Sequence, residues 1–297
     1  MDFLRFLAEY RIPAGDFFFQ LVTYLAQEIL VIGFVCWFFW SGNKNLAYKL
    51  GFSYFLSGLT IQGLKITFRI PRPWVLDPNF KAVDSALPAA TGYSFPSGHT
   101  QSGTSFFTTL AWQTKRSLWR ILCVIGFLLI GFSRMYLGVH TPKDVFTSMI
   151  LTFLITSMVC SQWKHLENDK SHDLLIAVLL TLIVAALIVY DIILLQNNIL
   201  DEKNASDCLK ACGAGLAFGA GFYLERRYIN FTVPTTTRDK ILRFTLGIAG
   251  VALIEFGGKA LLPSLLVFSC IRYFVIVLWI LVLYPLLFTK LEKKNRR

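Results

Sequence analysis

Charge is scarce in this chain. Only 16% of its 297 residues are Asp, Glu, Lys or Arg, whereas a soluble domain averages about 25%. A soluble globular domain is therefore a poor description of the sequence. Histidine is scarce as well, with four residues in the whole chain, so any two that fall together stand out.

The chain also lacks a cysteine framework and a leader sequence. Its six cysteines mostly lie inside apolar runs, which argues against a disulfide scaffold or a zinc site. Cys208 and Cys212 are one helical turn apart, and ordinary packing explains them. No cleavable signal peptide is predicted, because the first apolar run, from Phe17, is too long and has no small-residue cleavage site.

Long apolar runs are abundant instead. Apolar residues make up 55% of the chain, and runs of about 20 of them are typical of membrane-spanning helices. We therefore predict an all-α, polytopic transmembrane helix bundle, preceded by an amphipathic segment, 1–16, on the membrane surface. The nine predicted spans are 17–40, 47–69, 98–114, 118–137, 142–162, 173–195, 206–224, 241–258 and 265–289.

The connecting loops alternate in charge. Lys and Arg gather in every second loop and in the tail 290–297, whereas loop 197–207 is acidic. Because basic loops mark the cytoplasmic side, the N-terminus is predicted outside and the C-terminus in the cytoplasm. The net charge of +11 is thus explained by topology, and no nucleic-acid partner is indicated.

Three clusters of polar and charged residues fall on the predicted outer side. The first ends the second span, where Lys65 and Arg72 are seven residues apart and project to roughly the same side of a helix. Arg69 is one turn from Lys65 and could join them. A basic rim reaching toward the membrane surface would explain the same pattern.

The second cluster, Pro96-Ser97-Gly98-His99, opens the third span. A helix start leaves its first N–H groups unpaired and carries partial positive charge, so it binds phosphate readily. Gly98 would let a ligand approach the backbone closely. A serine N-cap followed by a chance histidine is the alternative.

The third cluster lies between the fourth and fifth spans. Arg134 ends the fourth span, and His140 stands just before the fifth. Thr141, Pro142 and Asp144 are typical of a helix start. Asp144 could serve only as a cap through Thr141, but that role accounts for neither His140 nor Arg134.

Together the clusters predict an anion site. Three fixed cations and a helix N-terminus suit a dianion, and two of the four histidines would stand beside it. Charged side chains within spans cost about 2.5–3.5 kcal/mol each at the bilayer centre, so their gathering near one end indicates a purpose. The other histidines, His165 and His172, are predicted to be solvated in a cytoplasmic loop.

The spacing of these clusters resembles the three-part motif of the type 2 phosphatidic acid phosphatase (PAP2) superfamily. All eleven fixed positions are present in order: Lys65–x6–Arg72–Pro73, Pro96–Ser97–Gly98–His99 and Ser133–Arg134–x5–His140–x3–Asp144. The resemblance covers residues 17–195 and implies a six-helix phosphatase core. We therefore predict a core over 1–196, followed over 197–297 by about three further spans and a basic cytoplasmic tail.

The resemblance also implies a role for each matched residue. His140 would be the nucleophile that forms a phosphohistidine, Asp144 would orient it, and His99 would protonate the leaving oxygen. Five residues would hold the phosphate oxygens: Lys65, Arg72, Ser97, Gly98 and Arg134. Because the cations supply the positive field, the resemblance implies no metal and no other cofactor.

The implied function is hydrolysis of a membrane lipid phosphate or diphosphate at the extracytoplasmic face. Candidate substrates include undecaprenyl diphosphate, phosphatidate, phosphatidylglycerol phosphate and sphingoid-base phosphates, and a soluble phosphate ester suits a lipid-facing site less well. The motif segments resemble bacterial members, which implies the bacterial inner membrane. The alternatives are a transporter or binding protein for phosphorylated amphiphiles without hydrolysis, and a vanadate-dependent haloperoxidase, although those relatives are soluble.

Overall fold

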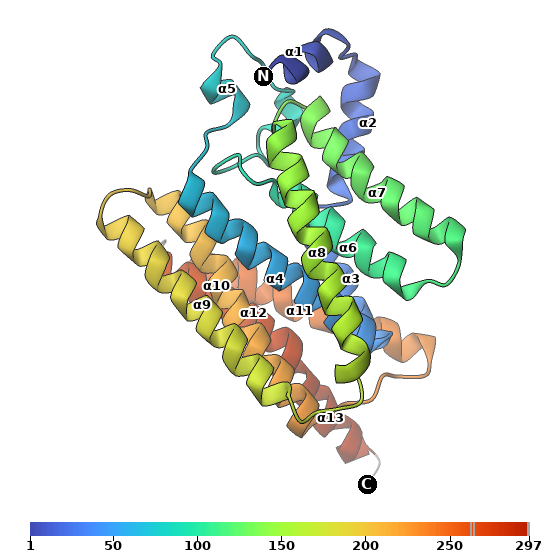
Figure 1. The fold of residues 1–297 in the computed structure, drawn as a ribbon. Helices are drawn as coiled ribbons and strands as arrows, with labels where there is room; N and C mark the ends of the chain where they lie inside the picture. Colours follow the sequence, from blue (N-terminus) through green and yellow to red (C-terminus); the bar gives the residue numbers. More distant parts are fainter. Residues whose placement is uncertain (262, 264, 296–297) are drawn as a thin grey trace. The chain divides into compact units, whose positions relative to one another are not determined.

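The structure is a computed structural model that describes residues 1–261, 263 and 265–295 (Figure 1). These residues form helices and connecting loops, without a strand anywhere among them. The all-α prediction is therefore confirmed over the described residues. Arg296 and Arg297, which end the predicted basic tail, lie outside the described residues.

The chain folds into two compact units. Unit 1 comprises residues 1–32 and 52–161, and unit 2 comprises residues 33–51 and 162–297. Three helices, α3, α4 and α8, contribute residues to both. The predicted boundary near residue 196, between a phosphatase core and the later spans, differs from this division into two units. It stays a prediction.

The helices follow one another with short connections in most places. Up to α8 they are α1 (Asp2–Glu9), α2 (Pro13–Tyr24), α3 (Glu28–Ser41), α4 (Lys44–Phe68), α5 (Pro73–Leu76), the 3₁₀ turn η1 (Asp84–Ala86), α6 (Gly98–Gln113), α7 (Ser117–Tyr136) and α8 (Pro142–Leu166). The remainder are α9 (Asp173–Gln196), α10 (Glu202–Leu224), the π-helix η2 (Glu225–Ile229), α11 (Thr237–Leu261), α12 (Leu266–Leu278), the π-helix η3 (Trp279–Leu283) and α13 (Tyr284–Asn295).

Within the described residues, six helical segments are long and apolar enough to cross a membrane, and they coincide with six of the nine predicted spans. They are Pro13–Ser41, Ser117–Tyr136, Pro142–Leu166, Asp173–Gln196, Thr237–Leu261 and Leu266–Leu291. The other three predicted spans are helices at the expected places, α4, α6 and α10. Their length or mean hydropathy is too low for them to be counted among the six candidate spans. Many polar residues of α6 are buried, and a helix that faces protein does not need an apolar surface.

Two predicted spans are less regular than expected. The first is broken between Tyr24 and Glu28, where the N–H groups of residues 25–27 bond the carbonyls three residues back and so tighten the turn. The last contains the π-helix η3 just before Pro285. Proline has no N–H to give to the preceding turn, which accounts for the irregular hydrogen bonding there.

In unit 1, the N-terminal helix α1 packs over the core rather than standing free. Leu4 and Leu7 are buried in a cluster with Phe80 and Met135, while the opposite face of α1 stays exposed. Arg5 links α1 to the segment that follows α5 by an ion pair, with its Nη2 2.8 Å from Asp77 Oδ2. The predicted amphipathic character of this segment is therefore present, with its apolar stripe turned toward protein.

In unit 2, small residues let α10 approach its neighbours closely. A Cβ added to Gly213 would come within 2.2 Å of the backbone oxygen of Cys270 on α12, so only glycine fits there. Gly219 similarly faces the backbone of α9 at Ala177. Backbones without side chains between them can pack closely in lipid, so these glycines allow α10 to approach both neighbours.

A buried polar network lies near the predicted cytoplasmic ends of the unit 2 helices. Glu225, fully buried in the π-helix η2, accepts from Lys44 Nζ at 2.5 Å and from the Tyr48 hydroxyl. Arg226 beside it donates to Asp173 at 2.8 Å. Such a network stabilises the fold only while every member keeps its partner.

Candidate active site

All eight residues predicted for the site lie in unit 1. They stand at helix ends: Lys65 in the last turn of α4, Arg72 before α5, Ser97, Gly98 and His99 at the start of α6, Arg134 at the end of α7, and His140 and Asp144 at the start of α8. Helix ends are where charged side chains can leave an apolar bundle. Five of the residues, namely Arg72, Ser97, Arg134, His140 and Asp144, are at most 7% exposed.

A glycine turn brings His140 back toward Arg134. Gly138 has φ +76°, a conformation that other residues rarely adopt. The N–H groups of Val139 and His140 then donate to the carbonyl of Arg134, at 3.1 and 3.3 Å. This ending of α7 resembles the glycine-dependent helix C-caps and sets the spacing between the arginine and the histidine.

Arg72 fixes the tautomer of His140. Arg72 Nη1 lies 2.9 Å from His140 Nε2, and a guanidinium has no acceptor atom, so it must be the donor. Nε2 therefore carries the lone pair and Nδ1 carries the proton. The same guanidinium donates to the carbonyls of Thr91, Gly92 and Val139, so it also joins two loops.

Asp144 faces the protonated side of that ring. Its Oδ2 lies 3.5 Å from His140 Nδ1 and accepts from the Ser94 hydroxyl at 2.6 Å. The Ser94 oxygen is itself 3.5 Å from Nδ1. Asp144 also accepts from the Thr141 N–H at 2.7 Å, so the capping role and the proximity to His140 occur together.

Arg134 is buried with most of its hydrogen-bonding capacity unused. It is 0% exposed, and its Nη1 donates to Thr23 Oγ1 at 2.9 Å. Its Nε and Nη2 have no partner among the described residues. A buried guanidinium edge of this kind is suited to two oxygens of a phosphate.

The start of α6 supplies backbone donors beside these side chains. Ser97 is the N-cap, and its hydroxyl accepts from the Thr100 N–H. The Ser97 N–H donates to the carbonyl of Asp144 at 3.2 Å, which leaves the N–H groups of Gly98 and His99 as the first-turn donors. A Cβ built on Gly98 would meet no atom within 4 Å, so open space lies over this backbone.

His99 and Lys65 complete the cluster on its more open side. Both are partly exposed. Lys65 Nζ donates to the carbonyl of Tyr93 at 2.7 Å, and Lys65, Arg72, Arg134 and His140 all lie close enough to act electrostatically on His99. Arg69, by contrast, turns back to the Ile66 carbonyl of its own helix at 2.7 Å.

The electrostatics of the cluster keep His140 neutral. Burial, followed by the charges of Arg72, Arg134 and Lys65, holds the pKa of His140 well below its ordinary value. Burial also lowers the pKa of Arg72 to about 10, against the opposing effect of Asp144. At neutral pH the cluster therefore combines a neutral imidazole with positively charged arginines.

Two residues of the cluster were missed by sequence reasoning. Thr23 lies on α2, more than 100 positions before Arg134, and no local sequence pattern indicates that these two residues are in contact. Ser94 immediately precedes Phe95 and the Pro96 motif, and it is 0% exposed. A serine so close to the motif was the only available signal, and it was a weak one.

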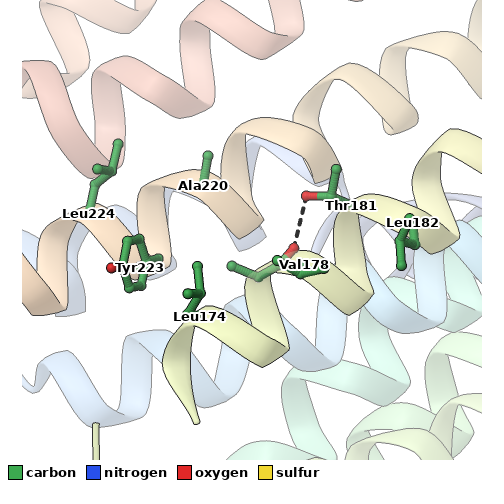
Figure 2. A pocket seen from close by; sticks show the side chains of 8 residues that line it. Leu174, Val178, Thr181, Leu182, Ala220, Tyr223 and Leu224 are labelled. Atoms are coloured by element: carbon green, nitrogen blue, oxygen red, sulfur yellow. Dashed lines mark hydrogen bonds between the residues drawn. The ribbon is translucent and has the colours of Figure 1, made fainter. Parts of the chain in front are cut away.

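An apolar groove of about 320 Å³ lies elsewhere, between α9 and α10 of unit 2 (Figure 2). Its lining includes Leu174, Val178, Ala220 and Leu224. The hydroxyl of Thr181 in its wall already donates to the carbonyl of Ala177 at 2.8 Å. The groove suits hydrocarbon and offers nothing for phosphate chemistry. Among the described residues, no group of three His, Cys, Asp or Glu side chains could hold a metal.

Comparison with known families places this cluster in context. Residues 46–168 match the model of the PAP2 superfamily, and residues 209–296 match the model described as PAP2 superfamily phosphatase, transmembrane extension. The chain belongs to the PAP2 superfamily. The first match contains every residue of the predicted site, and Thr23 lies outside both.

Several curated proteins resemble this PAP2 protein. Undecaprenyl-diphosphatase BcrC of Bacillus subtilis is 34% identical over 106 residues, which span 33% of this chain and 52% of BcrC. Sphingosine-1-phosphate phosphatase 2 of Mus musculus is 23% identical over 259 residues, 80% of this chain and 70% of that protein. Phosphatidylglycerophosphatase B of Haemophilus influenzae is 35% identical over 97 residues, 27% and 40% of the two chains. No solved structure is significantly similar to the chain.

Proposed function

We propose that this PAP2 protein is a membrane phosphatase that hydrolyses a lipid phosphate or diphosphate through a phosphohistidine. The observation that carries the proposal is the buried edge of Arg134, which has no partner in the part of the chain that the structure describes, next to the turn that presents His140. A fixed cation without a counter-ion favours binding of an anion. The names of the relatives, a diphosphatase and two lipid phosphatases, support the same class of substrate.

The first half of the reaction uses the lone pair of His140 Nε2. Arg72 donates to this atom in the structure, and an entering phosphate would take over that hydrogen bond. Nε2 then attacks the phosphorus while the bond to the leaving oxygen breaks. His99 gives that oxygen a proton, a contribution of about 10²–10⁴ in rate.

Asp144 and Ser94 support the imidazole during the attack. As Nε2 bonds to phosphorus the ring becomes positive, and the carboxylate of Asp144 stabilises it through Nδ1–H, as in other nucleophile–base triads. Arg134, Arg72 and Lys65, with the first N–H groups of α6, hold the equatorial oxygens, where charge redistributes in the transition state.

The second half of the reaction consumes water. His99, now neutral, takes a proton from a water molecule whose oxygen bonds to phosphorus, and the bond between Nε2 and phosphorus breaks. Inorganic phosphate leaves, and His140 returns to its starting tautomer. The positive field comes from the three cations, so the proposal needs no metal.

The charge of the loops supports an extracytoplasmic site. The site residues lie at the ends of α4 and α7 and the starts of α6 and α8, opposite the loops rich in Lys and Arg. Those loops mark the cytoplasmic side. In a bacterial cell the enzyme would act on the outer leaflet of the inner membrane.

The test is phosphate release by the purified protein from a panel of lipid substrates. Phosphatidate, a polyprenyl diphosphate, phosphatidylglycerol phosphate and a sphingoid-base phosphate are compared in detergent micelles. We expect release from at least one lipid, its persistence in EDTA, inhibition by vanadate, and loss of at least 1,000-fold, about 4 kcal/mol, in His140→Ala. Binding of a lipid phosphate without any release would favour the transporter or binding protein instead.

A further inference from the structure

Two rows of hydroxyl side chains run along α6 and α8 in unit 1, two helices that are joined by a hydrogen bond near each end of the rows. Each row repeats every four residues, so its members share one face of their helix. All are at most 2% exposed. We call these six residues the hydroxyl track: Thr100, Thr104 and Thr108 on α6, with Ser148, Thr152 and Thr156 on α8.

Contacts at both ends hold the two helices together around the track. At the end nearest the active site, Ser148 Oγ donates to the carbonyl of Ser97 at 2.7 Å. Farther along, Trp112 Nε1 on α6 donates to Ser157 Oγ on α8 at 3.4 Å. Ser97 is the N-cap of α6 and Ser148 lies in the second turn of α8, so the rows run from the starts of both helices toward the second contact.

The outer members of the track are bonded, whereas the deeper members are not. Thr100 Oγ1 donates to Ser97 Oγ at 2.9 Å, which connects the track to the N-cap of α6. Farther in, four buried hydroxyls have no hydrogen-bond partner among the described residues: those of Thr104, Thr108, Thr152 and Thr156.

On the neighbouring face of α6, which is turned toward α4, the polar side chains of Thr109 and Gln101 are hydrogen-bonded. Thr109 Oγ1 donates to the carbonyl of Ser105 at 2.7 Å, the usual bond of a threonine within a helix. Gln101 Nε2 reaches Ser57 Oγ on α4 at 2.7 Å. The unbonded hydroxyls of α6, on Thr104 and Thr108, instead belong to the four-residue row that ends at Trp112, which bonds α8. Buried polar groups of this kind in native proteins are satisfied by ordered water.

We propose that the hydroxyl track binds a file of water molecules that reaches from Ser97 into the contact between α6 and α8. Eight residues of helix separate Thr100 from Thr108, a length of about 12 Å at 1.5 Å per residue. Waters about 2.8 Å apart would number about four over that length. Each would find hydroxyls on both helices, which supplies the several partners that a buried water needs.

The hydroxyl track would deliver water to the active site from the side opposite the bound lipid. This step rests on the proposed function, because a lipid held at the open side of Gly98 and His99 would block water from that side. A water from the track would give its oxygen to phosphorus and its proton to His99, while the bond from His140 to phosphorus breaks. The next water in the file would then take its place.

Hydration of the track can be measured by X-ray hydroxyl-radical labelling, which oxidises side chains next to bound water. Met149 on α8 and Thr100 of the track both face Gly131 of α7, and Met149 is 8% exposed. Met135 on α7 belongs to the same hydrophobic cluster and is 6% exposed. We expect several-fold faster oxidation of Met149 than of Met135, and a several-fold decrease at Met149 in Thr104→Val/Thr152→Val. The matched control, Thr109→Val, should leave Met149 unchanged. Equal rates at the two methionines in the unmodified protein would overturn the proposal without any variant.

The supply of water to the reaction is tested by the steady-state level of phosphoenzyme. Slower dephosphorylation in Thr104→Val/Thr152→Val should raise the phosphorylated fraction several-fold over the unmodified protein and over Thr109→Val. An unchanged fraction, with Met149 labelled, would overturn the supply role and keep the hydrated track. If the unmodified protein released no phosphate from any lipid, the proposed function would fail, while the labelling result would still decide whether the track is hydrated.

Discussion

Thr23 offers the sharpest test of how the site is held together. It lies on α2, outside both matched family segments, and its hydroxyl accepts the one hydrogen bond that the Arg134 guanidinium makes among the described residues. Both residues are 0% exposed. Thr23→Val keeps the shape of the side chain and removes its hydrogen bond with Arg134. It also removes a longer contact of 3.3 Å from the Ser133 hydroxyl, which keeps its shorter bond to the carbonyl of Ile130.

The size of the effect follows from the charge on Arg134. A hydrogen bond to a charged group contributes about 1.5–3 kcal/mol, and about 1.4 kcal/mol corresponds to a factor of ten in rate. If Arg134 holds the transferred phosphoryl group, Thr23→Val should lower kcat/KM by about 10- to 150-fold. Thr23→Ser retains the hydroxyl and should stay within a few-fold of the unmodified protein.

The assay is phosphate release from the best lipid of the panel, together with inhibition by vanadate. Vanadate affinity should fall in parallel with kcat/KM, because both depend on how the Arg134 guanidinium is oriented. Thermal unfolding serves as the control for folding. A value of kcat/KM within two-fold of the unmodified protein, for a folded Thr23→Val, would refute the assignment of Arg134 as a phosphate ligand positioned by α2.

Four further predictions concern other contacts. His99→Ala should slow release from an alkyl phosphate far more than from an activated aryl phosphate, and equal losses would argue against His99 as the acid. Because the pKa of His140 is lowered, its protonation should not reduce kcat/KM at pH 6.5, and because the pKa of Arg72 is about 10, binding of an inert phosphate analogue should weaken above about pH 10; an analogue affinity that is constant to pH 11 would contradict the role of Arg72. Ser94→Ala should lower kcat about 10-fold, because Asp144 loses the hydrogen bond that holds its carboxylate, and Ser94→Thr should restore kcat. A change in KM with an unchanged kcat would contradict this positioning role. Glu225→Ala should reduce the free energy of unfolding by about 3–5 kcal/mol, because it leaves buried partners unpaired, and an unchanged Tm would show that the network contributes little.

Sequence reasoning located the helices well where they face lipid. The segments 118–137, 142–162 and 173–195 were recognisable because apolar runs of that length are typical of membrane-spanning helices and uncommon elsewhere. The break after Tyr24 was not predictable in the same way, since residues 17–40 read as one apolar run. Its cause is a set of tight backbone bonds, which no pattern of side-chain polarity records.

The site shows the same contrast. The order and spacing of Lys65, His99 and His140 predicted that they would gather, because each stands at the end of a helix on the same predicted side. The roles given to these residues remain predictions. Thr23 could not have been predicted, because its contact with Arg134 depends on how α2 packs against α7. Ser97, which is predicted to hold a phosphate oxygen, donates its N–H to the carbonyl of Asp144, and local sequence does not indicate this contact because it joins two separate segments.

The hydrogen bond from Arg72 to His140 Nε2 has a consequence for the idle enzyme. While it persists, the one lone pair able to attack phosphorus is occupied, so stray electrophiles and metal ions meet a shielded ring. Only a ligand that offers the guanidinium a better acceptor can expose it. In the proposed mechanism, the anion to be cleaved would thus expose the histidine that attacks it, and selectivity for phosphate would begin before any bond to phosphorus forms.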